Sequence, residues 1–566
     1  MIATPTDPTD PWLRQAQTFP VLSTEMAERA MAYGREETVA QDVFVFERGQ
    51  RAIDFFLVLD GQLQMFVDDI RHGRRSAYTY HRGQFSGEQN LFTNRPMLLS
   101  GCARAGSRLL RIANRDFHAF LTGEPDIGET IIRAYILRRA GFVRHAEGGV
   151  VLVGNRHHAD VLRIQRFLTR NLYPVAVVDP VADETGSSLM ASMDVAASAL
   201  PVVITPDRHV LPSPSNAALA NVLGINEPPE ADVVYDVAVV GAGPAGLAAS
   251  VYGASEGLNT IVLETLAPGG QAGTSSKIEN YLGFPTGISG QALAARAHIQ
   301  AQKFGARISV SHEVTSLDCS THPYRLILDD AISLRARSIV IATGARYRKL
   351  DVADYDRFEG QGIHYAATAM EAQVCADETI IVVGGGNSAG QAAIFLSQTV
   401  KHVHMLMRSG IASTMSDYLV QRIKSSPRIT LYQQAQITAL HGDKSLEGAT
   451  WIDRTSGMTH ELAVTSIFVM IGASPNTGWL EGCLDLDQHG FVKTGMAPSD
   501  DTPLSPYATS KDGIFAVGDV RSGSVKRVAS AVGEGSVVIA AVHQYLERQR
   551  HTDHERPVAV SHPSVT

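Results

Sequence analysis

The stretch DVAVVGAGPAGLAASVYGASEGLNTIVLE, residues 236–264, decides the fold of the C-terminal part of this chain. Four apolar residues, Val237–Val240, run directly into a glycine-rich turn. A helix rich in alanine follows, and then a second apolar strand, Thr260–Leu263, which ends at Glu264. A strand, a glycine turn, a helix, a second strand and an acid in this order are typical of a fold that binds a dinucleotide.

Each position of this fingerprint has a physical reason. Gly241 permits the tight turn, Gly243 lets the backbone approach a pyrophosphate, and Gly246 lets the helix pack on the strand. The helix N-terminus offers free N–H groups and the positive end of its dipole to the phosphates. Glu264 is placed to accept a hydrogen bond from an adenosine ribose hydroxyl.

A second fingerprint, TIIVVGGGNSAGQAAIFLSQTVKHVHMLMR, begins at Thr379. Arg408 lies 24 residues after Gly384, where an acid would mark NAD, and a cation there suits the 2′-phosphate of NADP. The residues expected to contact this nucleotide are Gly384, Gly386, Asn387, Ser388, Ala389 and Arg408. Two such folds in one chain imply FAD in the first and NADPH, or NADH, in the second.

The order of the motifs indicates how the two folds are connected. An Ala-Thr-Gly segment, Ile341–Ala345, precedes the second fingerprint, and GIFAVGDV, Gly513–Val520, follows it. In flavoproteins with two dinucleotide folds, these segments close the two lobes of the FAD domain. We therefore expect an NAD(P)H-binding domain, residues 350–464, inserted into an FAD-binding domain split into residues 233–349 and 465–548.

Residues 233–548 resemble bacterial thioredoxin reductase along nearly their whole length, including GGQ at 269–271 and IENY at 278–281. The resemblance implies that Gln271 and Asn280 border the isoalloxazine, that Asp519 holds the ribityl hydroxyls, and that the helix opened by Arg527 stabilises charge on the reduced flavin. It also implies a homodimer. The full set of expected FAD contacts is Gly241, Gly243, Pro244, Ala245, Gly246, Glu264, Gly270, Gln271, Asn280, Val314, Thr343, Gly344, Gly518, Asp519, Arg527, Val528 and Ala529.

The segment GIHYAATAME, residues 362–371, departs from that family. A working reductase has Cys-Ala-Thr-Cys-Asp after the tyrosine, whereas this chain has Ala366 and Ala369 at the cysteine positions and Met370 at the acid position. A flavin passes electrons to a disulfide only through such a thiol pair. Ser409 and Ser413 also replace further arginines of the family, which leaves NADH open beside NADPH.

Residues 15–145 show short apolar segments bounded by glycines, which predicts a small antiparallel β-roll. Phe55–Val67 and Gly83–Phe92 resemble the cyclic-nucleotide-binding fold, and Gly87-Glu88 matches its sugar-binding pair. The Pro-Arg that holds the cyclic phosphate in that family is inverted here to Arg95-Pro96. We therefore expect the fold without cyclic nucleotide binding, kept as an interaction or dimerisation surface.

Residues 148–226 resemble the thioredoxin fold, with a strand at Val150–Val153, a helix at His158–Arg170 and Pro201 as the family's cis-proline. The loop that would hold the redox cysteines reads GNRHH, residues 154–158, and contains no sulfur. Its two histidines are expected to be exposed loop residues, not metal ligands. The whole α/β multidomain arrangement resembles fusions of a cyclic-nucleotide-binding-like domain, a thioredoxin-like domain and a thioredoxin reductase.

Composition narrows the possible partners and location. The 566 residues carry a net charge of −9, which argues against nucleic-acid binding, and no run approaches 18 apolar residues, so no membrane span is expected. The N-terminus lacks the features of a signal peptide, and residues 1–14 and 549–566 read as disordered tails. The four cysteines lie more than 40 residues apart, which predicts buried free thiols and a cytoplasmic protein: Cys102, Cys319, Cys375 and Cys483.

Three functions fit these patterns. The first is an FAD-dependent NAD(P)H oxidoreductase whose unknown acceptor needs no dithiol, such as a quinone, a ferredoxin or flavodoxin, another flavin, or oxygen. The second is a redox or nucleotide-responsive regulatory scaffold, because three consecutive modules lack the residues that define their activity. The third is a thioredoxin-disulfide reductase that takes its thiols from a partner chain.

Overall fold

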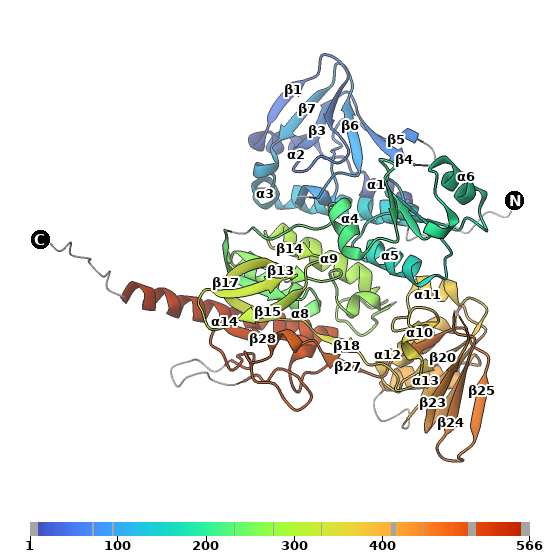
Figure 1. Cartoon of the computed structure of the whole chain (residues 1–566). Helices are drawn as coiled ribbons and strands as arrows, with labels where there is room; N and C mark the ends of the chain where they lie inside the picture. The colour runs from blue at the N-terminus through green and yellow to red at the C-terminus, as the bar shows by residue number, and fades with distance from the viewer. Residues whose placement is uncertain are drawn as a thin grey trace, which may run out of the picture. The chain divides into compact units, whose positions relative to one another are not determined.

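The structure of this chain is a computed structural model that describes residues 10–70, 73–92, 95–230, 232–275, 277–329, 331–408, 415–443, 445–495 and 505–555. The chain divides into two compact units (Figure 1). Unit 1 comprises residues 1–227 and 349–471, and unit 2 comprises residues 228–348 and 472–566. Unit 2 is therefore interrupted by residues 349–471, which fold with unit 1. The domain boundaries expected from the order of the motifs stay a prediction.

The first part of unit 1 is an antiparallel β-roll that ends in two helices. One sheet has the order β1 (Arg35–Thr38), β7 (Arg108–Ile112) and β3 (Phe55–Asp60). The other has the order β2 (Val43–Phe46), β6 (Leu99–Ala103), β4 (Leu63–Asp69) and β5 (Gly73–Tyr80). Helices α3 (Asn114–Gly123) and α4 (Pro125–His145) follow. Buried aromatic rings of the strands and helices form the core: Phe55, Phe85, Phe117, Phe120 and Tyr135.

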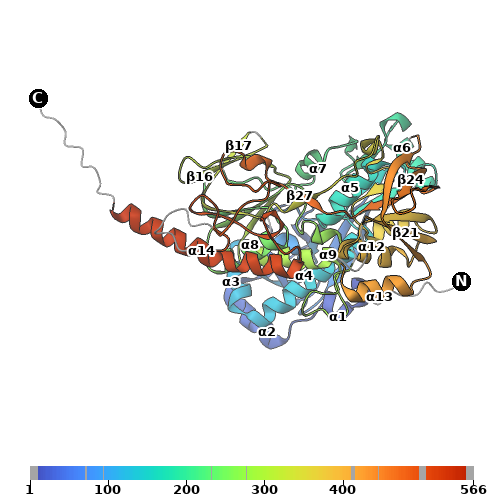
Figure 2. The ribbon, with the colours of Figure 1, turned by 90° about the horizontal axis from the view of Figure 1, so that it is seen from below.

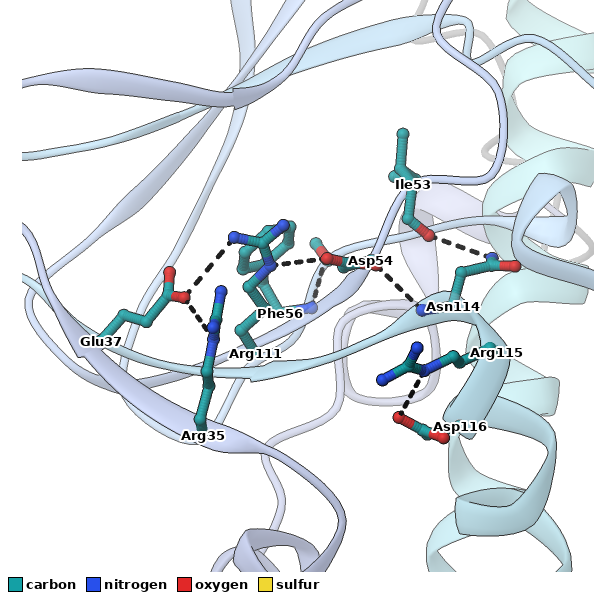
Figure 3. Close-up of polar contacts among 10 residues, drawn as sticks. Arg35, Glu37, Ile53, Asp54, Phe56, Arg111, Asn114, Arg115 and Asp116 are labelled. Carbon is teal, nitrogen blue, oxygen red and sulfur yellow. Dashed lines mark hydrogen bonds and ion pairs between the residues drawn. The ribbon is translucent and has the colours of Figure 1, made fainter.

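A polar cluster fixes the start of α3 on the sheet (Figure 3). Asp54, directly before β3, accepts hydrogen bonds from Nε of Arg111 at 2.5 Å and from the backbone N–H of Asn114 at 2.9 Å. Glu37 on β1 accepts from both Arg35, at 2.8 Å, and Arg111, at 3.5 Å. Because the residue before α3 offers no capping side chain, Asp54 supplies the acceptor that a helix N-terminus needs.

The N-terminal segment is more ordered than its sequence suggests. Residues Pro11–Leu13 form a 3-10 helix, and the Trp12 ring lies 5.7 Å from that of Phe19 and 5.4 Å from that of Phe142. The expectation of a disordered tail over 1–14 is therefore wrong from Asp10 onward, while residues 1–9 lie outside the described residues. Partial burial of the Trp12 ring against Phe19 and Phe142 helps to offset the entropy lost on ordering the segment.

The second part of unit 1 has the strand arrangement of a thioredoxin fold. Its sheet has the order β11 (Val210–Pro212), β10 (Val202–Ile204), β8 (Val150–Val153) and β9 (Val175–Val178), with only β8 and β9 parallel. The helices are α5 (Ala159–Arg170), α6 (Glu184–Ser192) and α7 (Asn216–Val222). The Leu200-Pro201 bond is cis, and Pro201 Cβ lies 3.0 Å from where a Cβ at Gly154 would be. Pro201 therefore faces the loop as the resemblance implies.

The third part of unit 1 carries the second fingerprint. Its parallel sheet has the order β19 (Ile363–His364), β26 (Ile467–Val469), β20 (Thr379–Val383), β21 (His402–Met407) and β22 (Ile429–Gln433). An antiparallel sheet is built from β23 (Ala435–His441), β24 (Gly448–Asp453) and β25 (Thr459–Leu462). The helices are α10 (Tyr355–Phe358), α11 (Ala369–Val374), α12 (Asn387–Leu396) and α13 (Asp417–Ser425).

Unit 2 carries the first fingerprint on a seven-stranded sheet. The strands β14 (Arg307–Val310), β13 (Thr260–Glu264), β12 (Val234–Val240), β17 (Ile332–Ile341) and β28 (Ile514–Ala516) are parallel. The strands β15 (Val314–Asp318) and β16 (Tyr324–Leu328) extend the sheet in antiparallel pairing. The chain leaves and re-enters unit 2 through the pair β18 (Ala345–Tyr347) and β27 (Ala473–Pro475).

Helix α14 (Val528–Glu555) lies along α8 (Pro244–Ser255), as Figure 2 shows. A Cβ at Gly535 would overlap the carbonyl oxygen of Ala245, so the two helices approach closely. The predicted tail over 549–566 is wrong for residues 549–555, which continue this helix, while 556–566 lie outside the described residues. No helix among the described residues is long and apolar enough to cross a membrane.

The expectation of four free thiols is also wrong. Cys319, which follows β15, and Cys483 form a disulfide with their Cα atoms 6.1 Å apart. The two residues are separated by 164 positions in sequence, so only the fold of unit 2 brings them together. Cys102 and Cys375 are free and buried, as predicted.

Candidate functional site

The glycine turn at the N-terminus of α8 leaves room for a phosphate. A Cβ at Gly241 would overlap the carbonyl oxygen of Ala342, and one at Gly246 would overlap that of Gly241, so both positions serve close packing. A Cβ at Gly243 would meet nothing within 4 Å. The backbone of Gly243 therefore faces open space at a helix N-terminus, which is the environment that a pyrophosphate requires.

Glu264 is held firmly beside this turn. Its Oε2 accepts from the backbone N–H of Ala242 at 2.8 Å, and its Oε1 accepts from Leu266 at 3.0 Å and Ala267 at 3.3 Å. A carboxylate has about four lone-pair sites, so acceptor capacity remains for a ribose hydroxyl. The predicted ribose contact is thus compatible with the geometry, but the carboxylate also has a structural role that the motif alone did not reveal.

Several distant segments converge on the start of α8. A Cβ at Gly270 would lie 2.9 Å from Cα of Gly243, and one at Gly518 would lie 3.0 Å from Cβ of Ala245. Nothing lies within 4 Å of a Cβ at Gly344, so the Ala-Thr-Gly segment also borders open space. Gly270 and Gly518 therefore lie against the start of α8, where an FAD pyrophosphate would need access to the helix N-terminus.

Two hydrogen bonds close the Ala-Thr-Gly segment against the returning chain. Thr343 Oγ1 donates to the carbonyl oxygen of Asn476 at 2.9 Å, and Asn476 Nδ2 donates to that of Thr343 at 3.0 Å. The Gln271 amide donates to the carbonyl oxygen of Ala345. Asn476 was missed by the sequence analysis; it directly follows β27, where the chain re-enters unit 2.

A buried acid positions the Gly518–Asp519 turn. Glu534 on α14 accepts from the backbone N–H of Gly518 at 2.5 Å and from Arg521 Nη2 at 2.7 Å. Burial raises the pKa of Asp519, and the nearby Glu534 adds to this while Lys526 opposes it. Glu534 was not recognised from the sequence, because its partners lie 13 and 16 residues away.

The remaining predicted flavin residues have simple placements. Asn280 lies exposed in the loop before α9 (Gly290–Lys303), and Val314 is buried at the start of β15. Val528 and Ala529 form the first turn of α14, directly after Arg527. The helix start that the resemblance placed by the flavin pyrimidine is therefore present.

The second fingerprint, in unit 1, repeats the arrangement of the first. A Cβ at Gly384 would overlap the carbonyl oxygen of Met470, whereas one at Gly386 would meet nothing within 4 Å. Asn387 and Ser388 open α12, Ala389 is fully buried, and Asn387 Oδ1 accepts from the backbone N–H of Ser416 at 2.7 Å. Arg408 is exposed directly after β21, while Ser409 and Ser413 lie outside the described residues.

Residues 366–369, where the related family has its dithiol, lead into the start of α11. The acid that binds this helix start is Glu371. Ala366 is half-buried and Ala369, the first residue of α11, is exposed. The backbone N–H and the hydroxyl of Thr368 both donate to Glu371 Oε2, the first at 2.9 Å. The bond from the Thr368 backbone N–H to the Glu371 carboxylate is one half of a Thr-x-x-Glu capping box, a signal visible in the sequence that was overlooked.

Glu371 is also paired with a residue of the thioredoxin-like part. Arg166 on α5 donates through Nε to Glu371 Oε1 at 2.9 Å, and its Nη2 forms an ion pair with the same oxygen at 2.9 Å and lies 3.4 Å from Nδ1 of His364. Burial would raise the pKa of Glu371, but Arg166 and Thr368 lower it. Burial and Arg166 lower the pKa of His364 to about 4. This region therefore holds a neutral imidazole beside an ion pair, in place of thiols.

In the β-roll, α4 fills the space beside the Gly87-Glu88 pair. Arg138 Nη1 donates to the carbonyl oxygen of Gly87 at 2.9 Å, and a Cβ at Gly87 would overlap the Tyr135 hydroxyl. Glu88 Oε2 lies 3.4 Å from Nη1 of Arg139. Arg95 donates to the carbonyl oxygen of Asn171 at 3.3 Å, which is in the thioredoxin-like part. These contacts give a physical reason for expecting no cyclic nucleotide, which stays a prediction.

His157 and His158 in the sulfur-free loop are exposed. His158 caps α5 by accepting from the backbone N–H of Asp160 at 3.2 Å. Within the part of the chain that the structure describes, no group of three or more His, Cys, Asp or Glu side chains has a metal-binding arrangement.

Comparison with known proteins identifies the C-terminal part of the chain. The pyridine nucleotide-disulphide oxidoreductase family matches residues 235–535, and the cyclic nucleotide-binding domain matches residues 36–124. The thioredoxin reductase of Streptomyces clavuligerus is 33% identical over 315 residues, covering 55% of this chain and 94% of that protein. The thioredoxin reductase of Treponema pallidum is 33% identical over 313 residues, covering 55% and 97%.

Solved structures agree with this assignment. Thioredoxin reductase from Lactococcus lactis matches with a TM-score of 0.51 and 27% identity, over 56% of this chain and 99% of that one. The enzyme from T. acidophilum matches with a TM-score of 0.51 and 30% identity over the same shares. Thioredoxin reductases use FAD and NADPH, and the two glycine turns described above fit such dinucleotides. The chain therefore belongs to the pyridine nucleotide-disulphide oxidoreductase family, as a thioredoxin-reductase-like flavoprotein oxidoreductase with an N-terminal cyclic nucleotide-binding β-roll.

Proposed function

We propose that this protein takes hydride from NADPH onto FAD and passes the electrons to an acceptor other than a disulfide. The observation that carries the proposal is the pair Ala366 and Ala369 at the positions of the redox cysteines. Thiol–disulfide exchange requires a thiolate nucleophile, and neither alanine can supply one. The residues that hold the cofactors are unaffected by this loss.

The nearest thiol does not substitute for the pair. Cys375 is buried, its Sγ donates to the carbonyl oxygen of Glu371 at 2.9 Å, and burial together with Glu378 raises its pKa to about 12. At neutral pH such a thiol is almost entirely protonated, and it lies beyond the reach of a substrate. Cys375 is therefore a structural residue in this proposal.

FAD, when bound, supplies the hydride-accepting chemistry, and the chain's residues bind and orient the two nucleotides. The open backbone at Gly243 and the dipole of α8 would hold the FAD pyrophosphate, with Asp519 at the ribityl chain. Gly386 and the start of α12 would hold the pyrophosphate of NADPH, and Arg408 would bind its 2′-phosphate. Because Arg408 is the discriminating cation, we propose NADPH as the preferred reductant.

The decisive experiment is an anaerobic titration of the FAD-loaded protein with NADPH and then NADH, following flavin absorbance. We expect bleaching at one equivalent of NADPH. With excess NADPH, turnover should then occur with a quinone but not with thioredoxin disulfide. Flavin that NADPH leaves oxidised, or thioredoxin reduction as fast as quinone reduction, would contradict the proposal. The second result would instead favour a reductase that borrows thiols from a partner chain.

The Cys319–Cys483 disulfide gives a useful control. A variant with Cys319→Ser and Cys483→Ser lacks the only disulfide found among the described residues. In this variant we expect the same flavin bleaching and the same quinone turnover. A loss of turnover with preserved bleaching would make the Cys319–Cys483 pair part of the electron path, which the proposal does not contain.

A regulatory scaffold is a second candidate, favoured by a chain of polar contacts within unit 1. Arg95 joins the β-roll to the thioredoxin-like part, and Arg166 joins that part to the nucleotide-binding part. Such contacts can transmit a change in one part to the next. The scaffold proposal predicts a protein partner whose affinity differs between oxidised and reduced flavin, and equal affinities would count against it. Homodimerisation and cytoplasmic location stay predictions.

A further inference from the structure

The contact between α5 and α11 joins two parts of unit 1 at the segment where the thiols are missing (Figure 1). Nε and Nη2 of Arg166 both lie 2.9 Å from the same carboxylate oxygen of Glu371, 205 residues away in sequence. The Glu371 side chain is 2% exposed and that of Arg166 is 34% exposed. The carboxylate is thus buried where α11 meets α5, and its cation comes from the thioredoxin-like part.

Glu371 needs this partner because a buried carboxylate without a nearby cation is costly. Its other contacts are with Thr368 on its own helix, which satisfy hydrogen bonds but supply no charge. His364, the other titratable group that faces Glu371, is neutral near pH 7 because burial and Arg166 lower its pKa. Arg166 is therefore the cation that the Glu371 carboxylate needs. This pairing requires α5 to pack against α11.

A second contact places α5 along the same surface. Cβ of Ala159 lies 3.4 Å from where a Cβ at Gly360 would be. Ala159 and Arg166 are seven residues apart, which is about two helical turns on one face of α5. The thioredoxin-like part therefore contacts the residues that lead into β19 and also the start of α11. These two segments precede and follow Ala366 in the sequence.

We propose that the thioredoxin-like part, residues 148–226, is the resident partner of the surface around Ala366 and Ala369, and that it closes this surface to a second protein. A specific protein partner covers roughly 800 Å² on each side of an interface. Two residues of this segment are already contacted by α5: Glu371, two positions after Ala369, and Gly360, three positions before β19. Ala369 itself is exposed, so a small molecule still reaches it.

The proposal goes beyond the oxidoreductase function and does not depend on it, because no cofactor takes part in these contacts. It is tested with the full-length FAD-loaded chain carrying Ala369→Cys. The rate of thiol–disulfide exchange is measured with two reagents that release thionitrobenzoate. One is 5,5′-dithiobis(2-nitrobenzoate), and the other is a single-cysteine thioredoxin that carries thionitrobenzoate as a mixed disulfide. In both reactions the new thiolate attacks, a mixed disulfide forms and thionitrobenzoate leaves.

A cysteine at Val181, which is 94% exposed, is the reference for unhindered access. We expect the small reagent to react with Ala369→Cys at a rate within threefold of Val181→Cys, and the protein reagent to react at least tenfold more slowly. Adding Arg166→Glu to Ala369→Cys should abolish the difference in rate between the two reagents. Adding Arg156→Glu, on the exposed loop of the same part, should leave that difference unchanged. Equal discrimination at the two cysteines, or no reaction of Ala369→Cys with either reagent, would overturn the proposal.

Arg166→Glu places a second carboxylate beside Glu371. An engineered disulfide cross-link therefore provides a second test in which Arg166 is unchanged. In a variant with Ala159→Cys and Gly360→Cys, the Cβ separation of about 3.4 Å is near the range that a disulfide spans. Oxidation should give the cross-linked peptide in most molecules, detected by mass spectrometry. A folded variant in which this peptide stays below a tenth of the material would show that α5 does not rest on this surface.

Discussion

Replacing Gly243 by alanine separates the stability of the fold from its ability to hold a cofactor. Gly243 has φ −68° and ψ −178°, which any residue adopts, and a Cβ there would meet nothing within 4 Å. Alanine reduces the entropy of the unfolded chain, worth about 0.4–1 kcal/mol, and is a poorer helix N-cap by a similar amount. We therefore expect the free energy of unfolding of Gly243→Ala without cofactor to stay within about 1 kcal/mol of the parent.

In contrast to the stability of the cofactor-free protein, the affinity for FAD should fall in Gly243→Ala. The new methyl group would occupy the space that the FAD pyrophosphate needs and would move the phosphate away from the N–H groups of α8. Losing one hydrogen bond to a charged group costs about 1.5–3 kcal/mol, which corresponds to a 10- to 150-fold rise in Kd. The assay is fluorescence titration of cofactor-free protein with FAD, together with urea unfolding of the same samples.

Two further glycines provide the controls. Gly533→Ala, at an open and exposed position of α14, should stabilise the protein by about 1 kcal/mol and leave the Kd for FAD unchanged. Gly246→Ala should disrupt the fold itself, because its Cβ would overlap the carbonyl oxygen of Gly241. If Gly243→Ala bound FAD with the parent Kd, or if it unfolded without cofactor, the assignment of this turn to the pyrophosphate would be wrong.

Three other perturbations test separate features. Because the pKa of His364 is about 4 in the folded state and 6.5 in the unfolded chain, the unfolded state binds more protons between these values, and stability should fall by up to about 3 kcal/mol as pH drops from 6.5 to 4. Urea unfolding across this range should show a flatter dependence for His364→Asn, and an identical slope would refute the assignment. Arg408→Ala should raise the KM for NADPH at least tenfold and change that for NADH less than twofold, in steady-state assays with a quinone; equal changes would remove Arg408 from the 2′-phosphate site. Cys102 and Cys375 should resist iodoacetamide in the native protein, because burial raises the pKa of both, and should react once the protein is unfolded in urea; rapid native labelling of Cys375 would make it a candidate nucleophile.

The two dinucleotide folds could be predicted because their signals are local. In each, a strand, a glycine turn and a helix N-terminus lie within about 30 residues, and the binding chemistry comes from backbone groups of the same segment. The strand at Val150–Val153 and the helix that ends at Arg170 were likewise predicted almost to the residue, because period-two and helical patterns are set by neighbouring positions. The alanines at positions 366 and 369, where the resemblance places the redox cysteines, are likewise read directly from the sequence.

The partners of these segments were decided only by the tertiary structure. Arg166 and Glu371 are 205 residues apart, Cys319 and Cys483 are 164 apart, and Arg95 and Asn171 are 76 apart. No periodicity or motif marks such pairs, because each depends on which surfaces come together when separate elements pack. The sequence alone therefore determined that the chain has two nucleotide-binding folds and no thiols at Ala366 and Ala369. The fold determined that the buried carboxylate of Glu371 pairs at this segment with a half-exposed arginine, Arg166, from the thioredoxin-like part.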